Sequence, residues 1–112
     1  MPNRCLLALT TCPDASCAAH IASALVGERL AACVSRLPGA MSTYRWEDKV
    51  QEDAEVLLLI KTTAARLPAL RERLLELHPY DVPELIAMPI KDGLPVYLDW
   101  LQQSVAQESG RR

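Results

Sequence analysis

Hydrophobic and polar residues follow two different periods along this chain, and each change of period marks the end of an element. Short apolar or alternating runs predict strands at 5–11, 31–37, 41–46, 49–61 and 85–90. Apolar residues spaced three and four apart predict amphipathic helices at 15–28, 67–78 and 94–107. Strands and helices therefore alternate along most of the chain.

Proline and aspartate mark several of these boundaries. Asp14 stands where a side chain can cap the first predicted helix. Pro79 and Pro83 each fix their own φ and push the preceding residue, His78 or Val82, out of the helical region. The second helix must therefore end at His78, and a stiff turn must follow it.

The order strand, helix, strand, strand, helix, strand is that of the ferredoxin-like βαββαβ sandwich, an α+β fold, with one additional C-terminal helix. We expect Pro38-Gly39 to form a turn or bulge that joins 31–37 to 41–46. With a turn at Glu47-Asp48, the segments 41–46 and 49–61 then form a long protruding hairpin. The length of 112 residues suits one domain spanning 1–112.

The central strands are more apolar than a half-covered sheet requires. Residues 5–9, 31–34 and 56–60 hardly alternate, and continuous apolar runs indicate strands that are buried on both faces. Two helices cover only one face of such a sheet, and an open apolar face exceeds what soluble monomers usually expose. We therefore expect a closed, symmetric homo-oligomer in which the sheets of neighbouring subunits face one another.

Composition narrows the class of protein. The net charge is -2 and the pI is near 5.6, so broad electrostatic binding to nucleic acid is not expected. No apolar run approaches the ~20 residues that span a bilayer, and the N-terminus lacks the pattern of a signal peptide. We expect a cytoplasmic protein with no membrane partner. In that compartment the four cysteines are expected to be reduced thiols: Cys5, Cys12, Cys17 and Cys33.

The turn after the second helix is a candidate site, because 78–84 holds an imidazole, a phenol and two carboxylates between its prolines. The alternative is structural: His78 caps the helix, where a cation suits the dipole, and Tyr80 packs on the core. The residues alone leave both interpretations open.

Eight short blocks in order carry a resemblance to a known family. They are Thr10-Thr11-Cys12-Pro13-Asp14, Glu28-Arg29-Leu30-Ala31-Ala32-Cys33-Val34, Pro38-Gly39, Ser42-Thr43-Tyr44-Arg45-Trp46, Ile60-Lys61-Thr62, His78-Pro79-Tyr80, Pro83-Glu84 and Tyr97-Leu98-Asp99-Trp100. Together they resemble the CutA divalent-cation tolerance family over nearly the whole chain. The resemblance implies a cytoplasmic, ferredoxin-like homotrimer, akin to the nitrogen-regulatory PII proteins, with a role in tolerance to metals, copper above all. One departure is Asp48, where the family usually has glycine; aspartate tolerates a left-handed backbone better than most residues.

The resemblance also implies metal ligands. Cys33 and His78 stand at positions to which copper binding in the family has been attributed, and thiolate and imidazole suit copper. Neither a CxxC nor an HxxxH pair occurs, so copper or another divalent cation would be bound weakly or transiently. A threefold axis could multiply one ligand into a cluster. Cys12 and Cys17 straddle the first turn and could come close, whereas Cys5 is expected in the core and His20 in solvent.

A second group of residues could line a cleft between subunits and grip a small ligand with rings and one charge: Lys61, Tyr80, Glu84, Tyr44, Trp46 and Trp100. The alternative is that Tyr44, Trp46, Tyr97 and Trp100 anchor the subunit interface. In the first case the protein is a PII-like sensor of a small metabolite or anion; its physiological ligand or partner protein is not specified by the sequence. No nucleophile elbow or phosphate-binding glycine loop occurs, so an enzyme is not expected.

Overall fold

The computed structural model describes residues 4–106, which form strands and helices in the predicted order. They are β1 (Cys5–Cys12), α1 (Ala15–Gly27), β2 (Cys33–Trp46), β3 (Lys49–Thr63), α2 (Leu67–Leu77), β4 (Ile86–Pro89) and α3 (Pro95–Val105). The segments predicted at 31–37 and 41–46 form the single strand β2, and the other predicted boundaries are correct to within two residues. Gln107, the predicted end of the last helix, and both ends of the predicted 1–112 domain lie outside the described residues.

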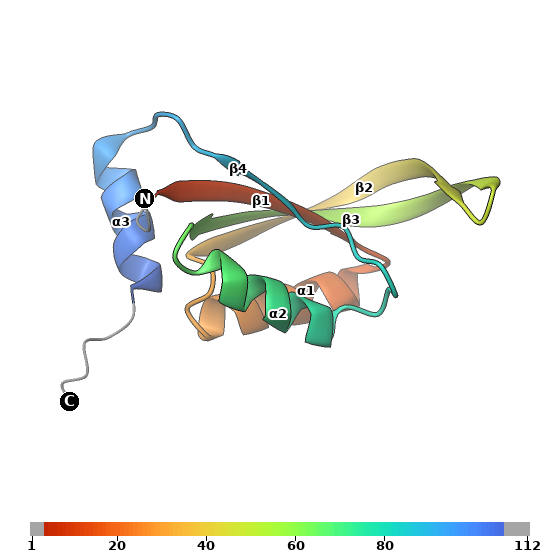
Figure 1. Ribbon diagram of the computed structural model, residues 1–112, viewed down its shortest axis with the longest axis horizontal. Helices are drawn as coiled ribbons and strands as arrows, with labels where there is room; N and C mark the ends of the chain where they lie inside the picture. Colours follow the sequence, from red (N-terminus) through yellow and green to blue (C-terminus); the bar gives the residue numbers. More distant parts are fainter. Residues whose placement is uncertain (1–3, 107–112) are drawn as a thin grey trace.

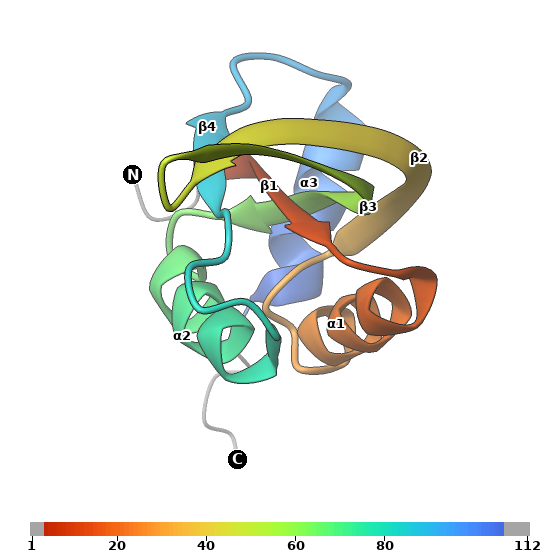
Figure 2. The same ribbon diagram turned by 90° about the vertical axis from the view of Figure 1, so that its right-hand side faces the viewer.

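The described strands form one antiparallel sheet in the order β2-β3-β1-β4. β1 runs through its centre, with Cys5 opposite Thr63 and Cys12 opposite Val56 on β3. Helices α1 and α2 lie side by side on one face of this sheet (Figures 1 and 2). The fold is therefore α+β, with a four-stranded antiparallel sheet and three helices among residues 4–106.

The main core lies between this face and the two helices. Strand residues at every second position, such as Ala8, Leu58 and Ile60, are fully buried there. They meet the apolar stripes of the helices, formed by Ala18, Ile21, Leu25, Leu70 and Leu74. Asp14 caps α1 by accepting a hydrogen bond from the Cys17 N–H at 2.8 Å, as predicted.

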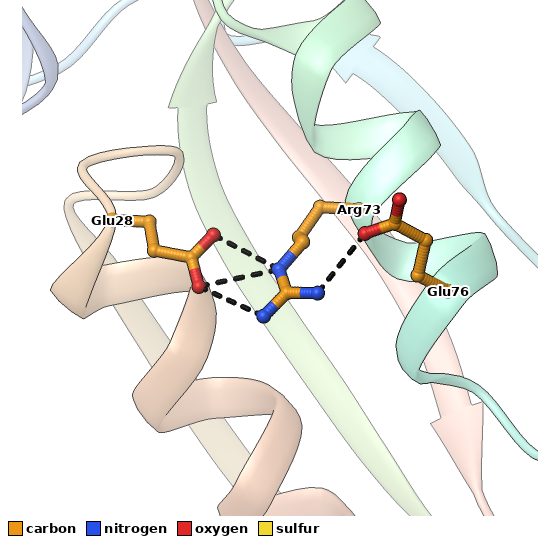
Figure 3. A network of polar contacts seen from close by, with 3 residues as sticks. All are labelled: Glu28, Arg73 and Glu76. Atoms are coloured by element: carbon orange, nitrogen blue, oxygen red, sulfur yellow. Dashed lines mark hydrogen bonds and ion pairs between the residues drawn. The ribbon is translucent and has the colours of Figure 1, made fainter.

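An ion-pair network joins the two helices at the surface (Figure 3). The guanidinium of Arg73 on α2 donates through Nε and Nη2 to Glu28, the C-cap residue of α1, with the Nε–Oε1 distance at 2.9 Å. Its Nη1 donates to Glu76 one turn further along α2, at 3.0 Å. The two-pronged geometry links the two helices, although exposed ion pairs of this kind contribute little to stability.

Among the described elements, α3 covers the opposite face of the sheet at one end (Figure 1). A second small core forms there from Cys5 and Ala32 with Leu101 and Val105. Beyond it, register places a set of apolar side chains on the uncovered face. They are the partly buried Leu7, Leu9, Leu57 and Leu59 and the exposed Ile86 and Met88.

Strands β2 and β3 continue past the sheet as a protruding hairpin (Figure 1). A bulge between Leu37 and Ala40, where Gly39 has φ 92°, shifts its register. Its turn is Glu47-Asp48, both with positive φ (51° and 64°), as in a type I′ turn. Because of this hairpin the radius of gyration is 15.0 Å, above the roughly 13 Å of a compact domain of this size.

No helix within residues 4–106 combines the length and the apolar character needed to cross a bilayer.

Candidate functional site

The turn after α2 is held by the imidazole of His78. Its backbone is extended (φ −82°, ψ 137°) before Pro79, so α2 ends at Leu77 as the prolines predict. The ring is buried. Its Nε2 lies 2.7 Å from the carbonyl oxygen of Thr11 on β1, and its Nδ1 accepts a hydrogen bond from the Tyr80 N–H at 3.2 Å. Since Nδ1 accepts, Nε2 carries the proton and donates to Thr11, and the ring has no free lone pair.

Two phenols point their hydroxyls at carboxylates of β3. Tyr80 donates to Glu55 Oε2 at 2.6 Å, and burial together with this bond raises the pKa of Tyr80 well above its ordinary value. Tyr44 on β2 donates to Asp53, and that hydrogen bond raises the pKa of Tyr44. Both phenols therefore stay protonated at neutral pH.

A cleft of about 580 Å³ opens between the hairpin and this turn. Figure 1 shows the loop after α2 rising toward the base of the hairpin. The cleft is lined by Thr11, Ser42, Thr43, Tyr44, Trp46, Glu55, Tyr80, Asp81, Val82 and Glu84. A volume of this size is in the range of small-molecule sites.

Four of the predicted cleft residues meet in this cleft within a single chain: Tyr44, Trp46, Tyr80 and Glu84. Sequence reasoning missed Glu55, which is only 8% exposed. The one signal it leaves in the sequence is its place, directly before the apolar run 56–60.

Lys61 lies elsewhere, on the uncovered face of the sheet. Its Nζ donates to Ser35 Oγ at 3.0 Å and lies 3.9 Å from Cys33 Sγ, because Lys61 is opposite Cys33 in the register of β2 and β3. On its other side Lys61 is opposite Leu7 of β1. Thr11, which holds His78, is four residues further along β1, roughly 13 Å away. One chain therefore does not bring Cys33 and His78 together.

Trp100 also lies outside the cleft. It is exposed on α3, at the end of the sheet away from the hairpin, and its ring centroid is 5.4 Å from that of Tyr97 (Figure 1). Burial, with the nearby thiols of Cys33 and Cys5, raises the pKa of Tyr97. The residues predicted to line one cleft are thus divided between two ends of the sheet.

The remaining cysteines and His20 do not form a metal site with these residues. The thiols of Cys12 and Cys17 come close enough to hydrogen bond, and burial above all raises the pKa of Cys12 to about 12, which keeps it protonated. Cys5 is buried and His20 is exposed, as predicted. Within residues 4–106, no three His, Cys, Asp or Glu side chains are grouped as metal ligands. The described part of one chain therefore does not supply a complete metal site.

Comparison with known proteins gives consistent matches. The family model of the CutA1 divalent ion tolerance protein matches residues 6–104. A Thermus thermophilus protein named divalent-cation tolerance protein CutA is 54% identical over 96 residues, covering 86% of this chain and 93% of that protein. Mouse protein CutA is 46% identical over 103 residues, but the chain spans only 58% of its length. The crystal structure of CutA from Xylella fastidiosa superposes with a TM-score of 0.90 at 48% identity, covering 92% of this chain and 99% of that one.

Proposed function

Because the chain belongs to the CutA1 divalent ion tolerance protein family, we propose that it acts in tolerance to divalent metal ions, copper above all, as a cytoplasmic homotrimer that is not an enzyme. The observation that carries this proposal is the family match over residues 6–104. All four cysteines are free thiols, which agrees with a reducing compartment.

The shape of the chain supports the proposed ferredoxin-like trimer. One face of its sheet carries exposed apolar side chains such as Ile86 and Met88, and the hairpin extends beyond the body of the molecule. Neighbouring copies would cover this face and pair with the hairpin, leaving fewer exposed strand edges.

Metal binding in this proposal depends on sharing ligands between subunits. Cys33 is partly exposed near the uncovered face, so one thiol from each of three copies could meet. His78 can join only if it gives up its hydrogen bond to Thr11 or to Tyr80. The Lys61 ammonium near Cys33 Sγ also repels a cation. We therefore propose weak or transient binding.

Calorimetric titration with Cu(I) and Cu(II) tests this assignment. We expect Cys33→Ser to abolish the binding heat, because thiolate sulfur is a main copper ligand. Cys17→Ser is the matched control and should leave the isotherm unchanged, since Cys17 lies on α1. His78→Gln tests whether the imidazole contributes. Isotherms identical to wild type in Cys33→Ser and His78→Gln would reject both ligands.

A second candidate function is that of a PII-like sensor of a small molecule, and the cleft between the hairpin and the turn after α2 favours it. Binding to the folded state would raise the melting temperature.

A further inference from the structure

The cleft between the hairpin and the turn after α2 contains a buried carboxyl group, that of Glu55, with no cationic side chain paired to it in the described part of the chain. Glu55 is 8% exposed and accepts a hydrogen bond from Tyr80. Within residues 4–106, no lysine, arginine or histidine nitrogen forms an ion pair with Glu55. Buried carboxylates are usually paired with a cation, because the cost of desolvating an isolated charge is high. Glu55 therefore lacks the cationic partner that a buried carboxylate usually has.

The other ionisable carboxyl groups that line the cleft are also acidic side chains. Asp81 and Glu84 add two further carboxylates, and no lysine or arginine is among the lining residues that the structure describes. An anionic ligand would meet only repulsion from these three groups. Within one chain, the lining of the cleft therefore favours a cation over an anion.

Three aromatic rings offer a second, independent contact. Tyr44, Trp46 and Tyr80 line the cleft and remain 41%, 45% and 36% exposed. The hydroxyls of Tyr44 and Tyr80 are held by Asp53 and Glu55, which restricts the orientation of the rings. Faces of tyrosine and tryptophan attract organic cations and also bury their apolar groups.

A bare metal ion suits this lining poorly. The carboxylates are dispersed, since no three acidic or other ligating side chains are grouped in the described part of the chain. The volume of about 580 Å³ is also far larger than a single ion requires. A ligand with a spread charge and an apolar body fits both the rings and the separated carboxylates.

We propose that this cleft binds a small organic cation, with its ammonium or guanidinium group at Glu55 and its apolar part on Tyr44, Trp46 and Tyr80. This inference rests on the sensor function proposed above and specifies its ligand class as cationic. It narrows the small metabolite or anion suggested by the sequence to a cationic small molecule.

Calorimetry on the full chain, with probes matched in shape, tests the role of charge. Choline and agmatine are the cationic probes, and 3,3-dimethylbutan-1-ol is the neutral isostere of choline. We expect choline to bind on the order of tenfold more tightly than the alcohol, because only choline gains the charge and ring contacts. Glutarate serves as the anionic probe and should not bind.

Substitutions then locate the site. Glu55→Gln keeps an acceptor for Tyr80 but removes the charge, so it should lower choline affinity about tenfold and abolish the preference over the alcohol. Glu72→Gln, an exposed carboxylate on α2, is the control and should change neither. Trp46→Leu should weaken choline binding while Trp100→Leu should not, because only Trp46 lines the cleft. Trp46 is exposed on the hairpin, so its replacement tests the site even if Glu55→Gln fails to fold.

The outcomes separate the ligand class from the sensor function. If glutarate or the neutral alcohol binds in a manner that depends on Trp46 while neither cation does, the cleft remains a ligand site and the cationic class is wrong. Equal affinity for choline and the alcohol also rejects the role of Glu55. If no probe binds, the cationic ligand class is wrong, whereas the sensor function fails only if no small molecule raises the melting temperature. Competitive displacement of choline by Cu(II), lost in Glu55→Gln, would instead identify a metal site.

Discussion

Two fully buried threonines on neighbouring central strands differ in the surroundings of their hydroxyls. Thr62 Oγ1 donates to the Leu30 carbonyl at 2.7 Å, whereas Thr10 Oγ1 has no hydrogen-bond partner among the described residues. An unsatisfied buried polar atom costs about 1–3 kcal/mol. Two identical side chains therefore have opposite effects on stability.

Replacing each threonine by valine, which has nearly the same shape, isolates the hydroxyl. We expect Thr10→Val to raise the free energy of unfolding by about 1 kcal/mol, because a desolvated oxygen is removed. Thr62→Val should lower it by about 1–2 kcal/mol, because the Leu30 carbonyl loses its donor. Chemical denaturation at equal protein concentration measures both changes. A loss of stability in both variants would contradict the assigned state of Thr10.

Chemistry at the level of single residues was partly predictable. Rings and charges in the sequence identify Tyr44, Trp46, Tyr80 and Glu84, which do meet in one cleft. Glu55 was not predictable, because a single carboxylate at the edge of an apolar run gives no sign of its burial. That burial depends on Tyr80 reaching across from the turn after α2, which is a tertiary contact.

The hairpin turn between β2 and β3 has a left-handed backbone. Asp48 has φ 64°, a left-handed conformation that is strained for residues with a side chain, though less for aspartate than for most, and costs glycine almost nothing. We expect Asp48→Gly to raise the free energy of unfolding by about 0.5–1 kcal/mol, after allowance for the greater flexibility of glycine in the unfolded chain. Thermal or chemical denaturation measures the gain.

At the bulge in β2, a glycine with positive φ can be replaced by a residue with a side chain. Gly39 has φ 92° and its added Cβ would meet nothing within 4 Å, so Gly39→Ala isolates the backbone cost and should destabilise the protein by about 1 kcal/mol. Gly27 has equally open surroundings but ends α1, and Gly27→Ala should be neutral or stabilising. Equal effects at the two glycines would show that the backbone conformation at Gly39 is not costly.

The boundaries of helices and strands were predictable where a single residue type restricts the backbone conformation. The prolines after α2 and the aspartate before α1 set their boundaries correctly. The start of β2 was placed at Ala31 but lies at Cys33, because the N–H of Ala31 still bonds to the Leu25 carbonyl at the end of α1. An apolar run does not distinguish a buried loop from a strand.

Assembly is a property of the whole molecule. The homotrimer proposed from the family match, which the uncovered sheet face and the protruding hairpin support, predicts a particle of about three times the 12.4 kDa of one chain by light scattering at micromolar concentration. Met88→Glu places a charge on this face and should lower the measured mass, because a carboxylate there is desolvated on assembly. Leu75→Glu, on the exposed side of α2, is the control and should leave the mass unchanged. A single-chain mass for the unmodified protein would overturn the trimer.

The relative placement of distant residues was the least predictable part. Cys33 and His78 suit copper as a pair by their chemistry, yet strand register sets them at different ends of the sheet. Register depends on side-chain alternation over whole strands and on the bulge at Leu37/Ala40, so it is not visible in residue types alone.

The double anchoring of His78 has a kinetic consequence. Because both ring nitrogens tie the turn to Thr11 and to Tyr80, one wall of the cleft is already rigid when the cleft is empty. Ligand binding then costs little conformational entropy of the protein, and no slow closure of the cleft precedes binding. The association rate constant should therefore approach the diffusion limit. Ligands should then differ in their dissociation rates rather than in their association rates.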